Sequence, residues 1–217
     1  MKWWKEDSQL YASFKNELAA FPFLELNLEN GKNIIRGLWP VFGESKLITK
    51  YSIKIEIPDD YPKSVPLVYE LEGKIPRIPD RHINYDNTCC LFAPPERWEQ
   101  WPLGTGIDVL LSGAVKQFFF SQAYFNRTGE WPFGEWLHGD VGVVQFYFER
   151  LNISSIQKLK QLLIAYPYRT PPRGWNCPCG SHRPYEDCHW KYMKPLIDIL
   201  PEEEWKYLIK VLTGIKS

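Results

Sequence analysis

The sequence predicts an α+β protein built from an N-terminal helix, a four-stranded antiparallel meander and C-terminal helices, followed by a small cysteine-rich tail. Apolar residues recur at helical spacing near the N-terminus, then alternate with polar residues, and return to helical spacing in the second half of the chain. At 217 residues the chain is long enough to bury an extensive core in one domain and to carry a small appendage.

The first expected element is an amphipathic helix over residues 8–21. Its apolar residues lie three or four positions apart, which places them on one face of a helix. These residues are Leu10, Tyr11, Phe14, Leu18 and Phe21. Pro22 follows directly and marks the end of the helix, because proline cannot continue the backbone hydrogen bonding.

Four strands are expected next. Apolar and polar side chains alternate in the first and third as they do in a half-buried sheet, the second is the return strand of a hairpin, and the fourth follows a proline-rich turn. Asn30-Gly31 lies between the first two strands and is the favoured pair for a two-residue hairpin turn. Pro66 cannot donate to a strand ladder, so it suits the start of the fourth strand. The expected strands cover residues 24–29, 34–41, 51–57 and 65–71.

Helices are expected in the second half of the chain. A broad apolar face begins near Asp108, and residues 129–142 are rich in glycine and aromatic residues and are expected to form a loop. Residues 167–173 contain three prolines and form the expected linker between two domains, 1–166 and 174–217. The later helices are expected over residues 143–151, 154–166, 191–200 and 201–212.

An irregular segment at residues 79–102 contains the first candidate site. Polar, turn-forming residues lead into the adjacent pair Cys89-Cys90, and His82 and Asn84 lie shortly before it. The thiolate is the reactive form of cysteine, so a thiol at the end of a polar loop can act as a nucleophile when its surroundings favour that form.

This segment resembles the active-site segment of ubiquitin-conjugating enzymes. In that family a His-Pro-Asn tripeptide precedes a Cys-Leu pair, which a tryptophan follows; here the corresponding residues are His82-Ile83-Asn84, Cys90-Leu91 and Trp98. The interval from the cysteine to Trp98 agrees with the family and favours Cys90 over Cys89. Ile83 stands where the family has proline, and the interval from His82 to Cys90 is shorter than in the family.

The resemblance implies a UBC-like fold and a catalytic role for two residues. Cys90 would accept the C-terminus of a protein as a thioester and pass it to an amine. Asn84 would donate a hydrogen bond to the oxyanion that develops during transfer. The order of helix, meander and cysteine-bearing segment in this chain is also similar to that of the family.

Two other functions remain open from the residues alone. The domain can be a non-catalytic binding module in which both cysteines are small buried residues, as Cys89 is expected to be in either case. Alternatively, Cys90 and His82 can form the pair of a cysteine hydrolase, for which no third, orienting residue is identifiable in the sequence.

The second candidate site is the string CPCGSHRPYEDCHW at residues 177–190. Three thiolates and one imidazole form a closed tetrahedral ligand set for a structural zinc ion, with no position left for water. The string resembles the SEC-C motif at the C-terminus of the SecA translocation ATPase, in its Cys-Pro-Cys-Gly-Ser opening and its Cys-His ending. The expected ligands are Cys177, Cys179, Cys188 and His189.

A short ubiquitin-conjugating-like domain with a SEC-C-type tail is similar to bacterial chains of anti-phage CBASS operons. That resemblance implies a protein partner, a cGAS-like nucleotidyltransferase whose C-terminus is modified. The sequence has no glycine-rich phosphate loop that would activate this C-terminus with a nucleotide, so activation is expected to be supplied elsewhere or to differ in kind.

Composition excludes several other classes of protein. The 26 basic and 26 acidic residues balance, which does not favour binding to nucleic acid or to a membrane surface. No apolar run approaches the ~18 residues that span a bilayer, and the N-terminus lacks the apolar region of a signal peptide. Two of the five cysteines are adjacent and would form a strained disulfide, so the protein is expected to be cytoplasmic.

Overall fold

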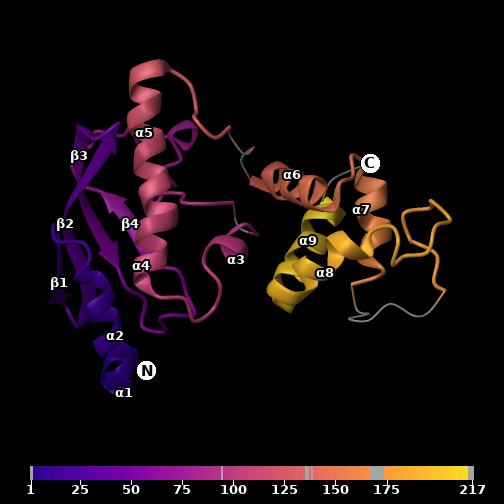
Figure 1. The fold of residues 1–217 in the computed structure, drawn as a ribbon, viewed down its shortest axis with the longest axis horizontal. Helices are drawn as coiled ribbons and strands as arrows, with labels where there is room; N and C mark the ends of the chain where they lie inside the picture. Colours follow the sequence, from indigo (N-terminus) through magenta and orange to yellow (C-terminus); the bar gives the residue numbers. More distant parts are fainter. Residues whose placement is uncertain (1, 94, 135–136, 138, 167–173, 215–217) are drawn as a thin grey trace. The chain divides into compact units, whose positions relative to one another are not determined.

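A computed structural model describes residues 2–93, 95–134, 137, 139–166 and 174–214 of the chain (Figure 1). These residues form helices and a four-stranded antiparallel sheet, which confirms the predicted α+β class. The chain divides into two compact units. The first contains residues 1–92 and 100–135, and the second contains residues 93–99 and 136–217.

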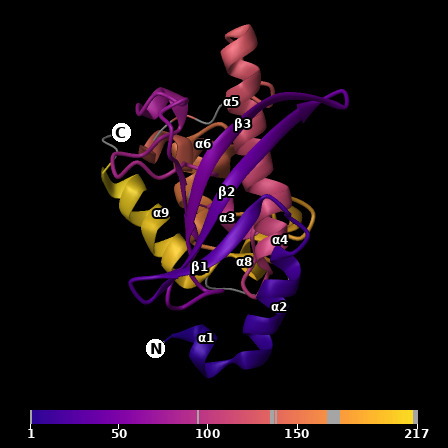
Figure 2. The same cartoon turned by 90° about the vertical axis from the view of Figure 1, so that its left-hand side faces the viewer.

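The sheet belongs to the first unit, and its strands follow one another in sequence order as an antiparallel meander (Figure 2). The four strands are β1 (Leu24–Glu29), β2 (Lys32–Gly43), β3 (Lys46–Glu56) and β4 (Leu67–Glu70). The predicted meander is confirmed. However, β2 and β3 are longer than the alternation of apolar residues indicated, and β4 begins only after Pro66.

Local sequence explains the two hairpin turns. Asn30 and Gly31 have φ values of 50° and 72°, the left-handed pair that a two-residue turn between twisted strands requires. The turn between β2 and β3 uses Glu44 and Ser45, also with positive φ. At Gly37 in β2 a Cβ atom would lie 1.9 Å from the carbonyl oxygen of Phe23, so the close approach of these two backbones requires glycine.

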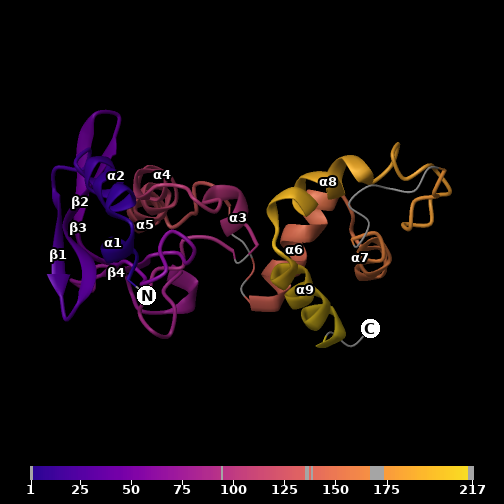
Figure 3. The ribbon, with the colours of Figure 1, turned by 90° about the horizontal axis from the view of Figure 1, so that it is seen from below.

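Two helices precede the sheet, and one long helical run follows it. The N-terminal helices are α1 (Trp3–Glu6) and α2 (Ser8–Leu18). The long run consists of α4 (Ile107–Leu110), a π-helical turn (Leu111–Val115) and α5 (Lys116–Thr128). Figures 1 and 3 show this run against one face of the sheet. The carboxylate of Glu17 in α2 accepts a hydrogen bond of 2.9 Å from the Ile107 amide and so caps the start of α4.

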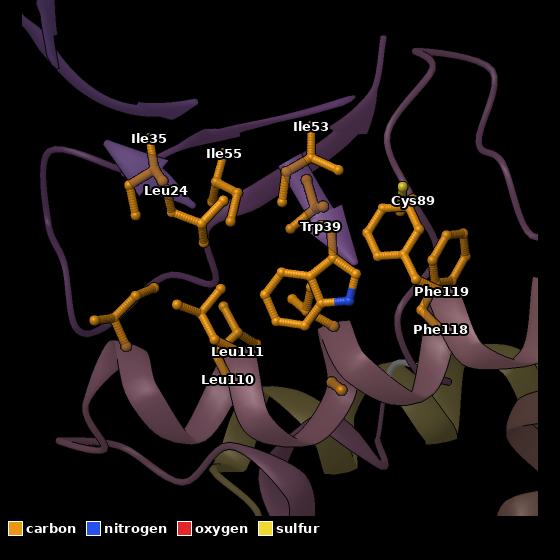
Figure 4. Packing of buried hydrophobic residues seen from close by; sticks show 14 of the residues in the cluster. Leu24, Ile35, Trp39, Ile53, Ile55, Cys89, Leu110, Leu111, Phe118 and Phe119 are labelled. Atoms are coloured by element: carbon orange, nitrogen blue, oxygen red, sulfur yellow. The ribbon is translucent and has the colours of Figure 1, made fainter. Parts of the chain in front are cut away.

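The core of the first unit lies between the sheet and this helical run (Figure 4). Ile35, Ile53 and Ile55 are completely buried because alternate residues of β2 and β3 point toward the helices. Leu110, Leu111 and Phe119 approach them from the helical side and are also completely buried. The predicted strands and helix therefore supply opposite walls of one core.

The second unit is helical. Its main helices are α6 (Gly139–Leu151), α7 (Ile156–Leu163), α8 (Trp190–Ile199) and α9 (Glu202–Gly214). All four contribute to a single hydrophobic cluster, in which the ring of Trp205 from α9 stacks on that of Tyr166 at 4.5 Å and packs near Tyr147 of α6. Helix α6 begins at Gly139, inside the segment expected to be a loop.

This cluster changes the expected domain boundary. The sequence suggested a division at residues 167–173, between 1–166 and 174–217, but α6 and α7 share their core with α8, α9 and the cysteine-rich segment. Residues 136–166 therefore belong with the tail, and the division lies near residue 136. The expected linker, residues 167–173, lies outside the described residues.

The short helix α3 (Arg97–Gln100) lies where the chain passes from one unit to the other. Glu99 forms an ion pair of 2.6 Å with Arg150 of α6. The Arg97 guanidinium lies 3.8 Å from the centre of the Trp98 ring, and Trp98 packs against the core of the second unit. Trp101 is instead buried in the first unit.

Candidate thiol site and metal centre

A small hydrogen-bonded hairpin presents the two adjacent thiols. Ile83 and Cys89 face each other in an isolated antiparallel bridge. On one side of this bridge the Cys90 amide donates to the His82 carbonyl at 2.8 Å, and on the other the Asn84 amide donates to the Thr88 carbonyl at 2.9 Å. The predicted irregular segment therefore contains a defined hairpin, which fixes the backbone of Cys90.

Side chains inside the hairpin hold its turn. The Asp86 carboxylate accepts hydrogen bonds from the Thr88 amide at 3.0 Å and from the Thr88 hydroxyl at 2.6 Å. These bonds, first of all the one from the hydroxyl, lower the pKa of Asp86, so the carboxylate stays charged. The left-handed φ of Asn87, 66°, closes the turn, and Tyr85 projects from it, almost fully exposed.

The two thiols have different surroundings. Cys89 is 7% exposed within the core of the first unit, and its amide donates to the carbonyl oxygen of Val68 in β4 at 2.7 Å. Burial raises the pKa of Cys89 far above its usual value, because the thiolate is poorly solvated there. Cys90 is half-buried, and its sulfur lies 3.8 Å from the Phe92 carbonyl oxygen. The prediction that Cys89 is buried is confirmed.

Asn84 lies in the same hairpin as Cys90. Side chains alternate across an antiparallel bridge, so Asn84 and Cys90 fall on the face opposite to the buried pair Ile83 and Cys89. The Asn84 amide nitrogen donates to the Thr88 hydroxyl at 2.9 Å. An amide group has two N–H donors, and within the described part of the chain this is the one hydrogen bond that the Asn84 side chain makes.

His82 is placed across the hairpin from Cys90 by the backbone bond described above. It has a left-handed φ of 51° and ends a short 3-10 helix, Pro79–Arg81. Its ring packs edge-on against Trp131 at 4.8 Å. His82 and Cys90, the two residues of the hydrolase hypothesis, are thus neighbours in the fold.

Sequence reasoning missed Arg81, which anchors the start of the hairpin. Its guanidinium donates to the Gln122 side-chain oxygen at 2.7 and 3.1 Å and to Asn126 at 2.7 Å, and Gln122 returns a bond of 2.8 Å to the Arg81 carbonyl. The group also lies 4.6 Å from the centre of the Phe125 ring. Burial lowers the pKa of Arg81 from its usual value. The Arg81 side chain therefore holds the start of the hairpin against α5.

The metal centre lies in the second unit. The ligand atoms of Cys177, Cys179, Cys188 and His189 all lie within 4.8 Å of one another, so the four expected ligands can hold a metal ion. The Cys179 and Cys188 sulfurs are 3.7 Å apart. The Nδ1 atom of His189 lies 3.4 Å from the Cys177 sulfur and 3.1 Å from the Cys188 sulfur.

Two of these three separations are close to those of a tetrahedral zinc site. Zinc–sulfur bonds of about 2.3 Å and zinc–nitrogen bonds of about 2.0 Å place two sulfurs about 3.8 Å apart, and a sulfur and a nitrogen about 3.5 Å apart. The sulfur–sulfur separation of 3.7 Å and the sulfur–nitrogen separation of 3.4 Å lie close to these values, and the second sulfur–nitrogen separation, 3.1 Å, is shorter; His189 presents Nδ1, not Nε2, to the thiols. Burial raises the pKa of Cys177 to about 12, and a bound cation would offset the cost of charging this thiol.

The backbone around the ligands forms a tight knuckle. The Cys177 amide donates to the Arg183 carbonyl at 2.8 Å, and Gly180 takes a left-handed φ of 80° as the chain reverses. The Ser181 hydroxyl and the Arg183 guanidinium each lie 3.3 Å from the Cys188 sulfur. His182 is exposed and is not one of the four clustered ligands.

Comparison of the chain with protein-family models, curated proteins and solved structures finds no significant match. Among the described residues, no helix combines the length and the apolar character that crossing a bilayer requires.

Proposed function

We propose that the first unit is a ubiquitin-conjugating-like domain whose Cys90 forms a thioester with the C-terminus of a protein partner. The difference between the two adjacent thiols is the observation that carries the proposal. Cys89 is sealed in the core, whereas Cys90 is half-buried at the end of a hydrogen-bonded hairpin. The order of helix, meander and cysteine hairpin supports a UBC-like fold for this unit.

The proposed reaction has two steps. The Cys90 thiolate attacks the carbonyl carbon of an acyl group that arrives activated, as an acyl adenylate or a thioester. A sulfur–carbon bond forms, and the adenylate oxygen or thiolate leaves with the electrons of the broken bond. An amine nitrogen then attacks the new thioester, the thiolate of Cys90 leaves, and the nitrogen loses its proton to solvent.

Asn84 is the proposed donor to the oxyanion formed in each step. By strand alternation it falls on the same face of the hairpin as Cys90, and one of its two amide hydrogens is donated to the Thr88 hydroxyl. This bond orients the side-chain amide while the second hydrogen remains available to a negatively charged oxygen.

The resemblance to CBASS-associated chains favours a cGAS-like nucleotidyltransferase as the partner, and anti-phage defence as the setting. We place the reaction in the cytoplasm, where reducing conditions keep such thiols reduced. For the second unit we propose a structural zinc ion held by the four clustered ligands. Because all four positions of the ion are filled by protein ligands, it would stabilise the knuckle and take no part in transfer.

The test uses full-length protein, a purified partner with an activated C-terminus, and three variants. Wild type and Cys89→Ala should form an adduct that dithiothreitol removes, and Cys90→Ala should form none. An adduct that persists in Cys90→Ala and disappears in Cys89→Ala would move the nucleophile to Cys89. His82→Ala separates the hydrolase hypothesis: if the acyl group goes to water in wild type and His82→Ala stops this loss, Cys90 and His82 hydrolyse the thioester.

A further inference from the structure

The first unit contains a cavity of about 560 Å³ that the proposed reaction does not use. Its walls come from four places: the segment between α2 and β1, the second half of β2, the turn between β2 and β3, and the helical run of the π-helical turn and α5. Concave sites of a few hundred Å³ that are lined mainly by apolar side chains are typical of small-molecule binding sites.

The base of the cavity is formed by buried side chains of β2, and its rim is apolar. Trp39 and Val41 of β2 are almost completely buried, and the Trp39 ring stacks on Phe21 at 6.0 Å with an interplanar angle of 22°. At the rim, Phe23 and Phe42 are 59% and 55% exposed. Large apolar side chains held open to solvent around a buried aromatic base favour an apolar ligand body.

One wall also carries polar groups. Ser112 and Lys116 lie four residues apart on the helical run, so they are neighbours along one face of it. Lys116 is exposed and makes no ion pair or hydrogen bond with any residue that the structure describes. Ser112 belongs to the π-helical turn, Leu111–Val115, and such turns occur frequently at functional sites.

The opposite rim carries the reverse charge. Glu44 lies in the left-handed turn between β2 and β3 and also lines the cavity. A negatively charged ligand group would therefore be repelled on the strand side and attracted on the helical side, where Lys116 and Ser112 lie. Lys116 is the one cation among the described lining residues, so the cavity suits a ligand with a single negative charge and not a polyphosphate.

We propose that this cavity binds a small amphipathic carboxylate, an apolar chain or ring with one anionic head. The apolar body lies over Trp39 between Phe23 and Phe42, and the carboxylate accepts hydrogen bonds from the Lys116 ammonium and the Ser112 hydroxyl. The apolar lining and the position of the Lys116 ammonium are the features that select this class of ligand. The proposal does not depend on the proposed thioester reaction.

Titration calorimetry of the full-length protein tests the proposal with three probes of equal chain length: decanoate, 1-decanol and decylammonium. Decanoate should bind most tightly, by about fivefold over 1-decanol, as expected for one partly exposed ion pair. Lys116→Gln should remove this preference and leave the affinity for 1-decanol within about twofold. Glu44→Gln should strengthen decanoate binding and weaken decylammonium binding.

Two further variants locate the binding site. Phe23→Ala removes an exposed rim residue and should weaken all three probes about fivefold, because each loses apolar contact. Leu67→Ala, a matched exposed residue on β4 that does not line the cavity, should change none of them. Equal binding of decanoate and decylammonium, an unchanged preference in Lys116→Gln, or no binding of any probe would overturn the proposal.

Discussion

Cys89 and Cys90 differ in what each can do, although one peptide bond joins them. A thiol whose pKa is raised by burial remains protonated at neutral and mildly alkaline pH, and the protonated form is a poor nucleophile. Cys90 lies outside the sealed cluster at the end of the hairpin, so reaction at this pair should be confined to Cys90.

Alkylation with iodoacetamide between pH 7 and 9 tests this difference. Peptide mass spectrometry should find label on Cys90 and little on Cys89 across the range, because the raised pKa of Cys89 keeps its thiolate fraction low. Cys90→Ala should remove the label from this peptide, and Cys89→Ala should retain it. Labelling of Cys89 at the same rate as Cys90 would contradict the assignment of Cys89 to the core.

The Arg81–Gln122 pair gives a second prediction at single residues. Gln122 is completely buried, so Gln122→Leu should leave the buried guanidinium without its main acceptor and lower the free energy of unfolding by about 2 kcal/mol. Urea unfolding measures this loss. Asn126→Ala, which removes an exposed acceptor of the same guanidinium, should cost less. Equal losses would show that burial does not set the strength of this contact.

Residue types near the cysteines predicted the candidate nucleophile, but not the group that anchors its loop. The four metal ligands followed from their spacing because a closed ligand set is local in sequence. Arg81 and Gln122 are far apart in the chain, and an arginine in a polar segment is normally exposed, so no local pattern indicated their contact. The hairpin around Ile83 and Cys89 was not predicted either, because a single bridge produces no repeating pattern of apolar residues in the sequence.

Among the elements, the existence and order of the strands were predicted best from the sequence. The lengths of the strands were predicted least well. Alternation identified the first and third strands, and turn residues identified the hairpin at Asn30-Gly31 and the start of the fourth strand, since each signal depends on neighbouring residues. The extension of β2 and β3 to Gly43 and Lys46 depends instead on pairing with the other strand. The π-helical turn inside the long helical run left no recognisable signal in the apolar spacing.

Removal of the proposed zinc ion should affect all helices of the second unit. Cys177 and Cys188 share one cluster with residues of α6 and α7, so loss of the knuckle would remove packing from those helices as well. Hydrogen exchange after treatment with a zinc chelator should show faster exchange over α6–α9, with α5 in the first unit unchanged. Faster exchange limited to residues 174–214 would restore the boundary expected from the sequence.

Each of the two units has its own hydrophobic core. A substitution in one unit can therefore change partner binding without changing the reactivity of a thiol in the other. We propose that the zinc knuckle of the second unit contacts the protein partner, whereas Cys90 lies in the other unit. The sequence missed this division because core sharing between 143–165 and the tail depends on tertiary packing, and not on the proline-rich segment between them.

Cys179→Ser tests this separation. The substitution removes one proposed zinc ligand, so it should lower affinity for the protein partner by more than about tenfold through loss of the knuckle. Reaction of Cys90 with iodoacetamide should stay within about twofold of wild type, since Cys90 lies in the first unit and the substitution lies in the second. Calorimetry and labelling rates provide the two measurements. Unchanged partner affinity together with confirmed loss of the metal would remove the second unit from partner binding.

Identification of the acylated atom tests the central claim most directly. In Cys90→Ser a hydroxyl replaces the thiol, so an acyl group transferred from the activated partner should remain as an ester that dithiothreitol does not remove. Tandem mass spectrometry of the digested adduct should then locate the partner's C-terminal residue on the side chain at position 90. An acyl group found on Cys89, or on a lysine with none at position 90, would contradict the proposed role of Cys90.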